Sequence, residues 1–195
     1  MRKFVSRGGL KLDHALDHFE LSVAGLLCAD FGCSTGGFTD CLLQRGARRV
    51  IALDTGYGVL DYSLRIDGRV EVRERSNVLH APPPDENVDL VVSDLSWTRQ
   101  SVAVEVARRW LGQGGRHISL IKPHYEIEPD EKKLLRKGVL PPEESERIFR
   151  RVVGQLGDSG VEVLSTVRSP IAGGGSRSGK GNVEYLALLA FPAAE

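Results

Sequence analysis

The stretch Asp30-Phe31-Gly32-Cys33-Ser34-Thr35-Gly36-Gly37-Phe38 joins a short apolar run, which starts at Leu26, to a segment with helical periodicity. Glycines let the backbone turn sharply and come close to a ligand. The helix that follows offers unpaired N–H groups at its first turn. The order of strand, glycine-rich turn and helix therefore predicts an α/β protein with a ligand site at this turn.

Strand-like and helix-like segments alternate outward from this turn. We expect strands at about 26–31, 50–54, 70–72, 88–94, 117–121, 161–167 and 183–191, and helices at about 10–19, 38–45, 97–111 and 144–156. Such alternation predicts a mostly parallel sheet with helices on both faces. Since no helical segment separates the last two strands, we expect the last strand of this seven-stranded sheet to be antiparallel. That arrangement differs from a plain dinucleotide-binding sheet and is common in methyltransferases.

Two segments, 124–142 and 172–181, have the composition of loops. Both follow the carboxyl ends of predicted strands or flank the last one. Ligand crevices of open α/β sheets lie along that edge, so we expect both loops to border the site.

The composition excludes several classes of protein. The 26 basic and 26 acidic residues cancel, which argues against a strongly basic nucleic-acid binder and leaves only local patches to attract phosphate. Cys28, Cys33 and Cys41 form no CxxC pair, so we expect free thiols and no metal site. No apolar run is long enough for a membrane span and the N-terminus lacks a signal-peptide core. We therefore expect a cytoplasmic protein of one domain, residues 1–195, without membrane contact.

The glycine-rich turn favours an adenosine cofactor without phosphates. Its pattern is G-x-S-x-G-G, in which Ser34 crowds the place that a pyrophosphate would need. Asp30 would repel a phosphate but can pair with a cationic amino group. The methionine half of S-adenosylmethionine carries such a group. An NAD site, or a tight turn without a ligand, is the alternative.

Asp54 ends the second strand, 22 residues after Gly32. A carboxylate at this position can accept hydrogen bonds from both hydroxyls of an adenosine ribose. Asn77 follows the third strand and either contacts the adenine edge or belongs to a turn. Together with Gly32, Gly36, Gly37 and Phe38, these residues complete the predicted cofactor site.

Four charged residues stand out as candidates for chemistry. Asp94 and Lys122 end the fourth and fifth strands, on the expected ligand edge. Glu184 lies at the start of an apolar strand, where a carboxylate needs a partner because unpaired buried charge is costly. Lys11 lies on the first helix. The plain alternatives are a surface charge for Lys11 and a structural ion pair for Glu184.

Four motifs resemble the FtsJ-like RNA 2′-O-methyltransferases, and within them the TlyA-type, or hemolysin A-like, branch. They are Ser6-Arg7-Gly8-Gly9-Leu10-Lys11-Leu12, Gly32 to Asp40, Lys122-Pro123 and Gly181-Asn182-Val183-Glu184. The resemblance runs from residue 4 to about 190. It implies a Rossmann-like S-adenosylmethionine-dependent methyltransferase fold, in which the N-terminal helix within residues 1–22 contributes to the active site.

That family uses a Lys-Asp-Lys-Glu tetrad, which the resemblance assigns to Lys11, Asp94, Lys122 and Glu184. A ribose 2′-hydroxyl must lose its proton as it attacks the methyl carbon. A lysine can take that proton only when its pKa falls, and a second ammonium nearby has that effect. The resemblance therefore implies that Lys122 is the base or orients the oxyanion, that Lys11 positions the hydroxyl, and that Asp94 and Glu184 hold the lysines. No metal is required, and Asp94 also borders the cofactor.

The implied partner is RNA, most simply ribosomal RNA or a ribosomal subunit. TlyA-type proteins carry an S4-like domain before the Ser-Arg-Gly-Gly segment, which we expect to be absent here. RNA contacts would then fall to cations of this domain, namely Arg2, Lys3, Arg7, Lys132, Lys133, Arg136, Lys137, Arg168, Arg177 and Lys180. His124 and Tyr125 either stack on the target nucleotide or pack the base of their loop. The alternatives to an RNA enzyme are a catalytically idle module of the same fold and a small-molecule methyltransferase.

Overall fold

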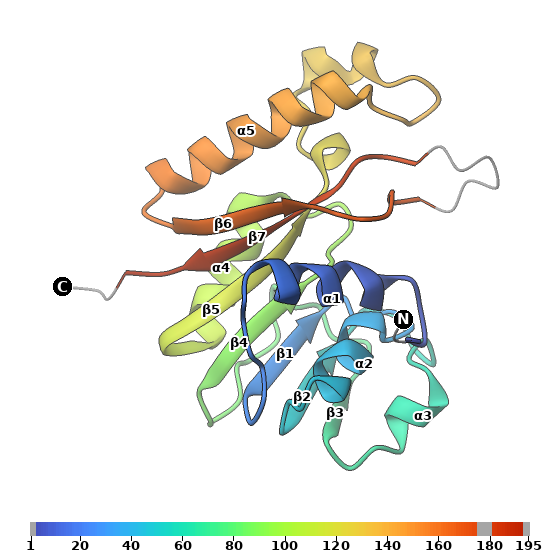
Figure 1. Ribbon diagram of the computed structural model, residues 1–195, viewed down its shortest axis with the longest axis vertical. Coiled ribbons are helices and arrows are strands. Elements are labelled where there is room, and N and C mark those ends of the chain that lie inside the picture. The colour runs from blue at the N-terminus through green and yellow to red at the C-terminus, as the bar shows by residue number, and fades with distance from the viewer. Residues whose placement is uncertain (1–2, 175–180, 193–195) are drawn as a thin grey trace.

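One seven-stranded sheet organises the molecule in the computed structural model, which describes residues 3–174 and 181–192 (Figure 1). The strand order is β3-β2-β1-β4-β5-β7-β6. The strands are β1 (Leu27–Phe31), β2 (Arg49–Leu53), β3 (Val70–Arg73), β4 (Val88–Ser93), β5 (Leu111–Ile121), β6 (Glu162–Arg168) and β7 (Tyr185–Ala190). β7 runs antiparallel to both β5 and β6, and the remaining pairs are parallel. The predicted sheet is confirmed, including its antiparallel last strand.

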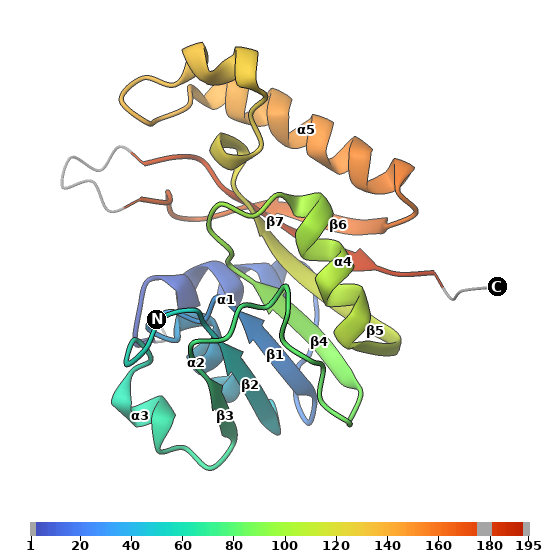
Figure 2. The same ribbon diagram turned by 180° about the vertical axis from the view of Figure 1, so that it is seen from behind.

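Helices cover both faces of this sheet, as expected. They are α1 (Gly8–His18), α2 (Gly37–Gln44), α3 (Tyr62–Arg65), α4 (Gln100–Trp110) and α5 (Pro142–Asp158), with short 3-10 helices η1 (Pro123–Tyr125) and η2 (Pro129–Leu134). Figure 1 shows α1 and α2 in front of the sheet, and Figure 2 shows α4 on the opposite face. No helix in the described part of the chain is long and apolar enough to cross a membrane.

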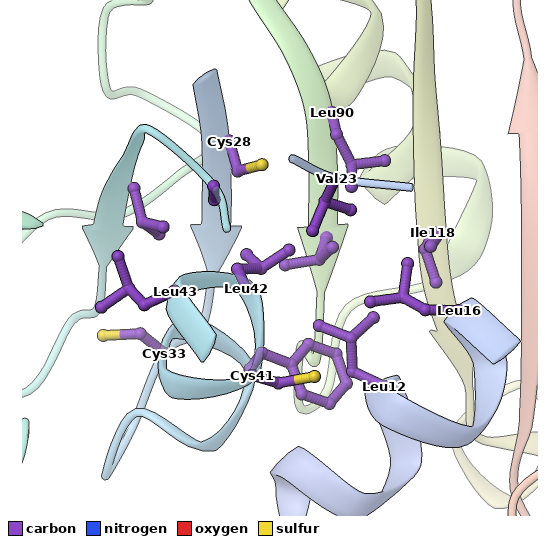
Figure 3. Packing of buried hydrophobic residues seen from close by; sticks show 14 of the residues in the cluster. Leu12, Leu16, Val23, Cys28, Cys33, Cys41, Leu42, Leu43, Leu90 and Ile118 are labelled. Atoms are coloured by element: carbon purple, nitrogen blue, oxygen red, sulfur yellow. The ribbon is translucent and has the colours of Figure 1, made fainter. Parts of the chain in front are cut away.

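The apolar strands contribute to three hydrophobic clusters. Alternate residues of a strand point to opposite faces of the sheet, and β7 also packs against α5. All five residues of β1 are buried. Cys28 packs with α1 and α2, through Leu12, Leu16 and Leu42 among others (Figure 3), whereas Leu27 and Ala29 pack against α4. A strand buried on both faces reads as a continuous apolar run, which is why the sequence located β1 well.

Three details differ from the sequence prediction. The segment 124–142 is not a plain loop, because it contains η1 and η2. β5 begins at Leu111, six residues before the predicted start, since its glycine-rich first half carries no apolar pattern although Leu111 pairs with Val88. The short helix α3 was not predicted. It starts where the side chain of Asp61 accepts a hydrogen bond from the backbone N–H of Ser63.

Candidate active site

Two adjoining cavities open at the carboxyl ends of β1, β2 and β4. The inner cavity, of about 220 Å³, is bordered by α1, the glycine-rich turn and residues 171–174. The outer cavity, of about 430 Å³, is bordered by the turn after β2, residues 76–79 and residues 94–98. Gly32, Ser34 and Asp94 line both cavities. A single elongated ligand could therefore occupy the two cavities across the end of β1.

The glycine-rich turn shapes this crevice, but its glycines have different roles. Gly32 has a φ of +79°, and a Cβ atom there would lie 2.8 Å from the carbonyl oxygen of Asp94. Gly36 has a φ of +101° and faces Leu60 and Leu64, outside both cavities. Gly37 lines the inner cavity, where a Cβ atom would collide with Ser6. Of the predicted cofactor glycines, Gly36 thus serves the packing of the turn instead of bordering the crevice.

Asp30 lies in the wall of the inner cavity and is fully shielded from solvent. Its Oδ2 accepts hydrogen bonds from the backbone N–H of Thr39, at 2.9 Å, and from the Thr39 hydroxyl, at 2.7 Å. Its Oδ1 has no partner. Burial raises the pKa of Asp30 to about 7, and the nearby Asp94 and Asp54 add to the rise. A cationic group placed at Oδ1 would relieve both the missing hydrogen bond and the cost of burying the charge.

Asp54 and Asn77 both border the outer cavity. The carboxylate of Asp54 accepts the N–H of Ser34 at 2.9 Å and the N–H of Gly56 at 2.7 Å, one on each oxygen. Each oxygen keeps a second acceptor position. The side-chain oxygen of Asn77 accepts the N–H of Leu79. Asn77 therefore forms a turn of its own, and at the same time lines the cavity.

Lys11 and Glu184 form a buried ion pair, with Nζ and Oε2 2.5 Å apart. Lys11 comes from α1, and Glu184 directly precedes β7. The aliphatic part of Lys11 lies among buried residues of the helix, and only 8% of Lys11 and 3% of Glu184 is exposed. Lys11 also lines the inner cavity.

Lys122 and Asp94 form a second ion pair, with Nζ and Oδ1 2.6 Å apart. They follow β5 and β4, which are neighbours in the sheet. Lys122 also donates to the hydroxyl of Ser96 at 3.4 Å and lies 5.7 Å from the centre of the Tyr125 ring.

Lys11 and Lys122 are both connected to the inner cavity, Lys11 directly and Lys122 through Asp94. Lys11 and Asp94 line one cavity, and Asp94 holds Lys122. Burial lowers the pKa of the His124 imidazole to about 4. The positive charges of Lys122 and, to a lesser extent, Lys11 contribute to this decrease. The structure thus brings the four residues of the expected tetrad to one edge of the sheet.

An aromatic pair, Trp97 and Tyr125, lies beside Lys122. The Trp97 side chain is 84% exposed, its backbone has a φ of +62°, and its ring lies 4.7 Å from that of Tyr125. His124 in turn lies 4.2 Å from Tyr125, centre to centre. Trp97 also lines the outer cavity. His124 and Tyr125 therefore pack against each other at the rim, with Trp97 outermost.

A chain of buried polar side chains, which was not predicted from the sequence, begins at Ser93, next to Asp94. The hydroxyl of Ser93 lies 2.8 Å from Nε2 of His117 and 3.1 Å from the hydroxyl of Ser119. Ser119 donates to Oε1 of Gln100 at 2.6 Å, and the backbone N–H of Gln100 donates to Glu126 at 2.8 Å. The chain links the ends of β4 and β5 to α4 and to the segment after Lys122. Polar residues within otherwise apolar strands were the available signal.

Gly173 was not singled out either. A Cβ atom on Gly173 would lie 1.7 Å from Oε1 of Glu184. Its backbone pairs with Asn182 in both directions, at 2.9 and 3.0 Å. Gly173 therefore leaves the space in which the Glu184 carboxylate meets Lys11.

The other expected RNA contacts are partly described. Lys3, Arg7 and Arg168 are exposed, and Arg7 donates to the carbonyl of Ala172. Arg2, Arg177 and Lys180 lie outside the described residues, as does part of the expected loop 172–181.

The fold is the one that S-adenosylmethionine-dependent methyltransferases adopt. Solved structures from that class share the fold at TM-scores of 0.60 to 0.68, with 13% to 17% identity. More specifically, the profile of the FtsJ-like methyltransferases matches residues 4–191. The chain belongs to the FtsJ-like methyltransferase family.

Individual relatives agree with this assignment. The chain is 38% identical over 191 residues to the 16S/23S rRNA (cytidine-2′-O)-methyltransferase TlyA of Mycobacterium tuberculosis, covering 96% of this chain and 69% of that one. It is 37% identical to hemolysin A of Brachyspira hyodysenteriae, covering 95% and 76%. A Streptococcus thermophilus protein, provisionally named a hemolysin, superimposes with a TM-score of 0.87 at 35% identity, covering 97% and 67%. The chain thus spans about two thirds to three quarters of the length of these relatives.

Proposed function

We propose that the chain transfers the methyl group of S-adenosylmethionine to a ribose 2′-hydroxyl of ribosomal RNA. The observation that carries this proposal is that Lys11 and Asp94, one residue from each of two lysine–carboxylate pairs, line the cavity beside the glycine-rich turn. The activity for which the Mycobacterium tuberculosis relative is named, methylation of cytidine 2′-oxygens in rRNA, gives additional support. Such a substrate implies a cytoplasmic protein.

The residues of the crevice fit this cofactor. The unpartnered Oδ1 of Asp30 suits the cationic amino group of its methionine half. The free acceptor positions of Asp54 suit the hydroxyls of its ribose. Gly32 and Ser34 border both cavities and leave room between these two acids. Bound here, S-adenosylmethionine would supply an electrophilic methyl group and a neutral thioether as leaving group.

Lys122 is the residue that we assign to the reacting hydroxyl. Its neutral amine would take the proton at Nζ, or its ammonium would stabilise the negative charge that develops on the 2′-oxygen. Asp94 keeps Nζ at the mouth of the crevice.

Lys11 would position the same hydroxyl, and Glu184 holds the ammonium group of Lys11 in place. A hydroxyl held between two such groups reacts faster because its approach is already oriented. No step in this assignment needs a group from outside the chain other than the two substrates.

The experiment is to incubate the protein with S-adenosylmethionine labelled in its methyl group and with ribosomal RNA transcribed in vitro. The RNA is then digested to nucleosides and the label is located by mass spectrometry. We expect a 2′-O-methylnucleoside. DNA of the same sequence is the control, and it should accept no label because it lacks the hydroxyl.

Other results would contradict the proposal. Label on a base would make the protein a different RNA methyltransferase. Cofactor binding without transfer to RNA or assembled subunits would favour the idle module. Transfer to small molecules alone would make the protein a small-molecule methyltransferase.

A further inference from the structure

The segment 126–137, which follows the reacting lysine, carries four acidic and four basic residues, and most of the acidic ones are paired. Three of its four acidic side chains are bound to neighbouring segments, whereas Asp130 is exposed. Glu131, 9% exposed, accepts hydrogen bonds from Arg147 and Arg151 of α5 at 2.8 Å each. These contacts lower the pKa of Glu131 to about 2. Glu128 pairs with Arg99, and Glu126 accepts the N–H of Gln100.

The basic side chains of the same segment turn outward. Four residues, Lys132, Lys133, Arg136 and Lys137, are all exposed, and we call them the basic rim. Within the described ranges, none of the four makes an ion pair, whereas Arg99, Arg147 and Arg151 next to them are all paired. Since the protein as a whole has no net charge, four neighbouring unpaired cations form a local site of positive potential.

The basic rim is held in place, as a binding surface must be. Glu131 and Glu128 form a capping box at the start of η2. A two-way backbone bridge joins Arg136 to Val139 at 2.8 and 3.0 Å. The N–H of Leu140 donates to the side chain of Asn182 at 2.8 Å, two residues before Glu184. The segment that carries the basic rim is therefore connected to Lys122 through the chain and to the residues before Glu184 through this hydrogen bond.

The basic rim also lies on the correct side of the molecule. In Figures 1 and 2 the segment between η1 and α5 extends from the same edge of the sheet as the residues near 172 and 182. A substrate that reaches Lys122 from solvent would extend over this edge.

We propose that the basic rim binds the phosphates of the RNA strand that flanks the methylated nucleotide. This inference rests on the function proposed above. Lysine and arginine contacts to phosphates position an RNA without reading its sequence, and each contact releases a counterion. The rim thus supplies affinity and register, and the tetrad supplies the chemistry.

The test is the variant K132Q/K133Q/R136Q/K137Q, which removes the four charges of the rim. RNA affinity is measured at several salt concentrations. We expect the slope of log K against log salt to become shallower by about 0.7–0.9 for each phosphate that the variant no longer binds, and affinity near physiological salt to fall roughly 10- to 100-fold. KM for RNA should rise by a similar factor. The rate at saturating RNA and the affinity for S-adenosylmethionine should stay near those of the native protein.

The matched control is R48Q/R69Q/R108Q/R116Q, which removes four positive charges from residues that line neither cavity. It should leave the salt slope almost unchanged. If the two variants lose RNA affinity equally, or if neither loses any while the native protein methylates RNA, the rim is not the phosphate surface. If instead the native protein methylates no RNA, the proposed function fails before the rim is tested, so the two failures are distinct.

Discussion

The two lysine–carboxylate pairs have the same chemistry and different surroundings. Nζ and the carboxylate oxygen are 2.5 Å apart in Lys11–Glu184 and 2.6 Å apart in Lys122–Asp94. The side chain of Glu184 is 3% exposed, whereas that of Asp94 is 28% exposed. The first pair joins residues 173 positions apart in the chain. The second joins the ends of two adjacent strands.

The difference in exposure between the two carboxylates suggests that the two ion pairs have different roles. A buried pair is costly to break, because the remaining charge cannot reach water. A pair at the mouth of two cavities can exchange partners when a substrate arrives. We therefore expect Lys11–Glu184 to govern stability and position, and Lys122–Asp94 to govern the rate.

The largest effect should come from Lys122. We expect Lys122→Ala to reduce methyl transfer by about 10³-fold or more, the combined loss of proton transfer and charge stabilisation. Calorimetric titration should show nearly unchanged affinity for S-adenosylmethionine. Lys122→Arg sharpens the assignment, because arginine keeps the charge but does not give up its proton. Substantial activity in that variant means that Lys122 orients the oxyanion; none means that it is the base.

The second effect concerns stability and should distinguish the two pairs. Lys11→Ala leaves Glu184 buried without a partner, so we expect the free energy of unfolding to fall by about 3–5 kcal/mol. The same change at Lys122 should cost only about 1 kcal/mol or less, because Asp94 reaches solvent. Chemical denaturation measures both values. Equal losses would contradict the division of roles.

The next prediction concerns the space occupied by the Glu184 carboxylate, which a substitution can change while Glu184 keeps its charge. Gly173→Ala places a methyl group where the carboxylate lies, so we expect a loss of about 1–3 kcal/mol in stability and a reduced rate of transfer. Gly154→Ala is the control, since a Cβ atom there meets open space. A G173A protein as active as the native one would show that the position of Glu184 is unimportant.

The smallest effect concerns Asp30 and depends on pH. Its folded-state pKa of about 7 lies above the ordinary value of 3.8, so the folded protein binds more protons than the unfolded chain between these values. The stability contributed by the protonated acid is therefore present at low pH and lost as pH rises toward 7 and above. Asp30→Asn should be more stable than the native protein by about 1–2 kcal/mol at pH 8, and no more stable at pH 4.

The same variant should bind S-adenosylmethionine more weakly, because a neutral amide lacks the negative charge that attracts the amino group of the cofactor. Thermal unfolding at both pH values, with cofactor titrations at pH 8, measures these effects. Unchanged cofactor affinity would remove Asp30 from the binding site.

The sequence predicted what depends on local pattern. Leu27 to Phe31 and the glycines after it specify the first strand, turn and helix, because apolar runs and positive-φ positions are visible in a single segment. The start of β5 was predicted wrongly at residue 117, since hydrogen bonds to β4 and not side-chain pattern extend that strand to Leu111. η2 was missed because Glu131, which anchors it, is paired with residues 16 and 20 positions away.

The same distinction between local patterns and long-range contacts applies to the candidate active site. Asp54 could be placed by its distance from the glycine-rich turn, but Gly36 belongs to the packing of α3 and lies outside the crevice. The four charged residues were grouped through a family resemblance, and only the fold brings Lys11 to Glu184. No local pattern predicts the space that Gly173 leaves for that carboxylate, because it depends on two segments meeting.

The most direct measurement is a double-mutant cycle on the two lysines, with single-turnover rates of methyl transfer to RNA. The variants are Lys11→Met, Lys122→Ala and the two together, each first shown to be folded and to bind S-adenosylmethionine. Groups that act on one hydroxyl as a unit give strongly non-additive effects. We therefore predict that the double variant is no slower than the slower single variant. Rate losses that multiply would show that the two lysines act independently, and would contradict their convergence on one reacting group.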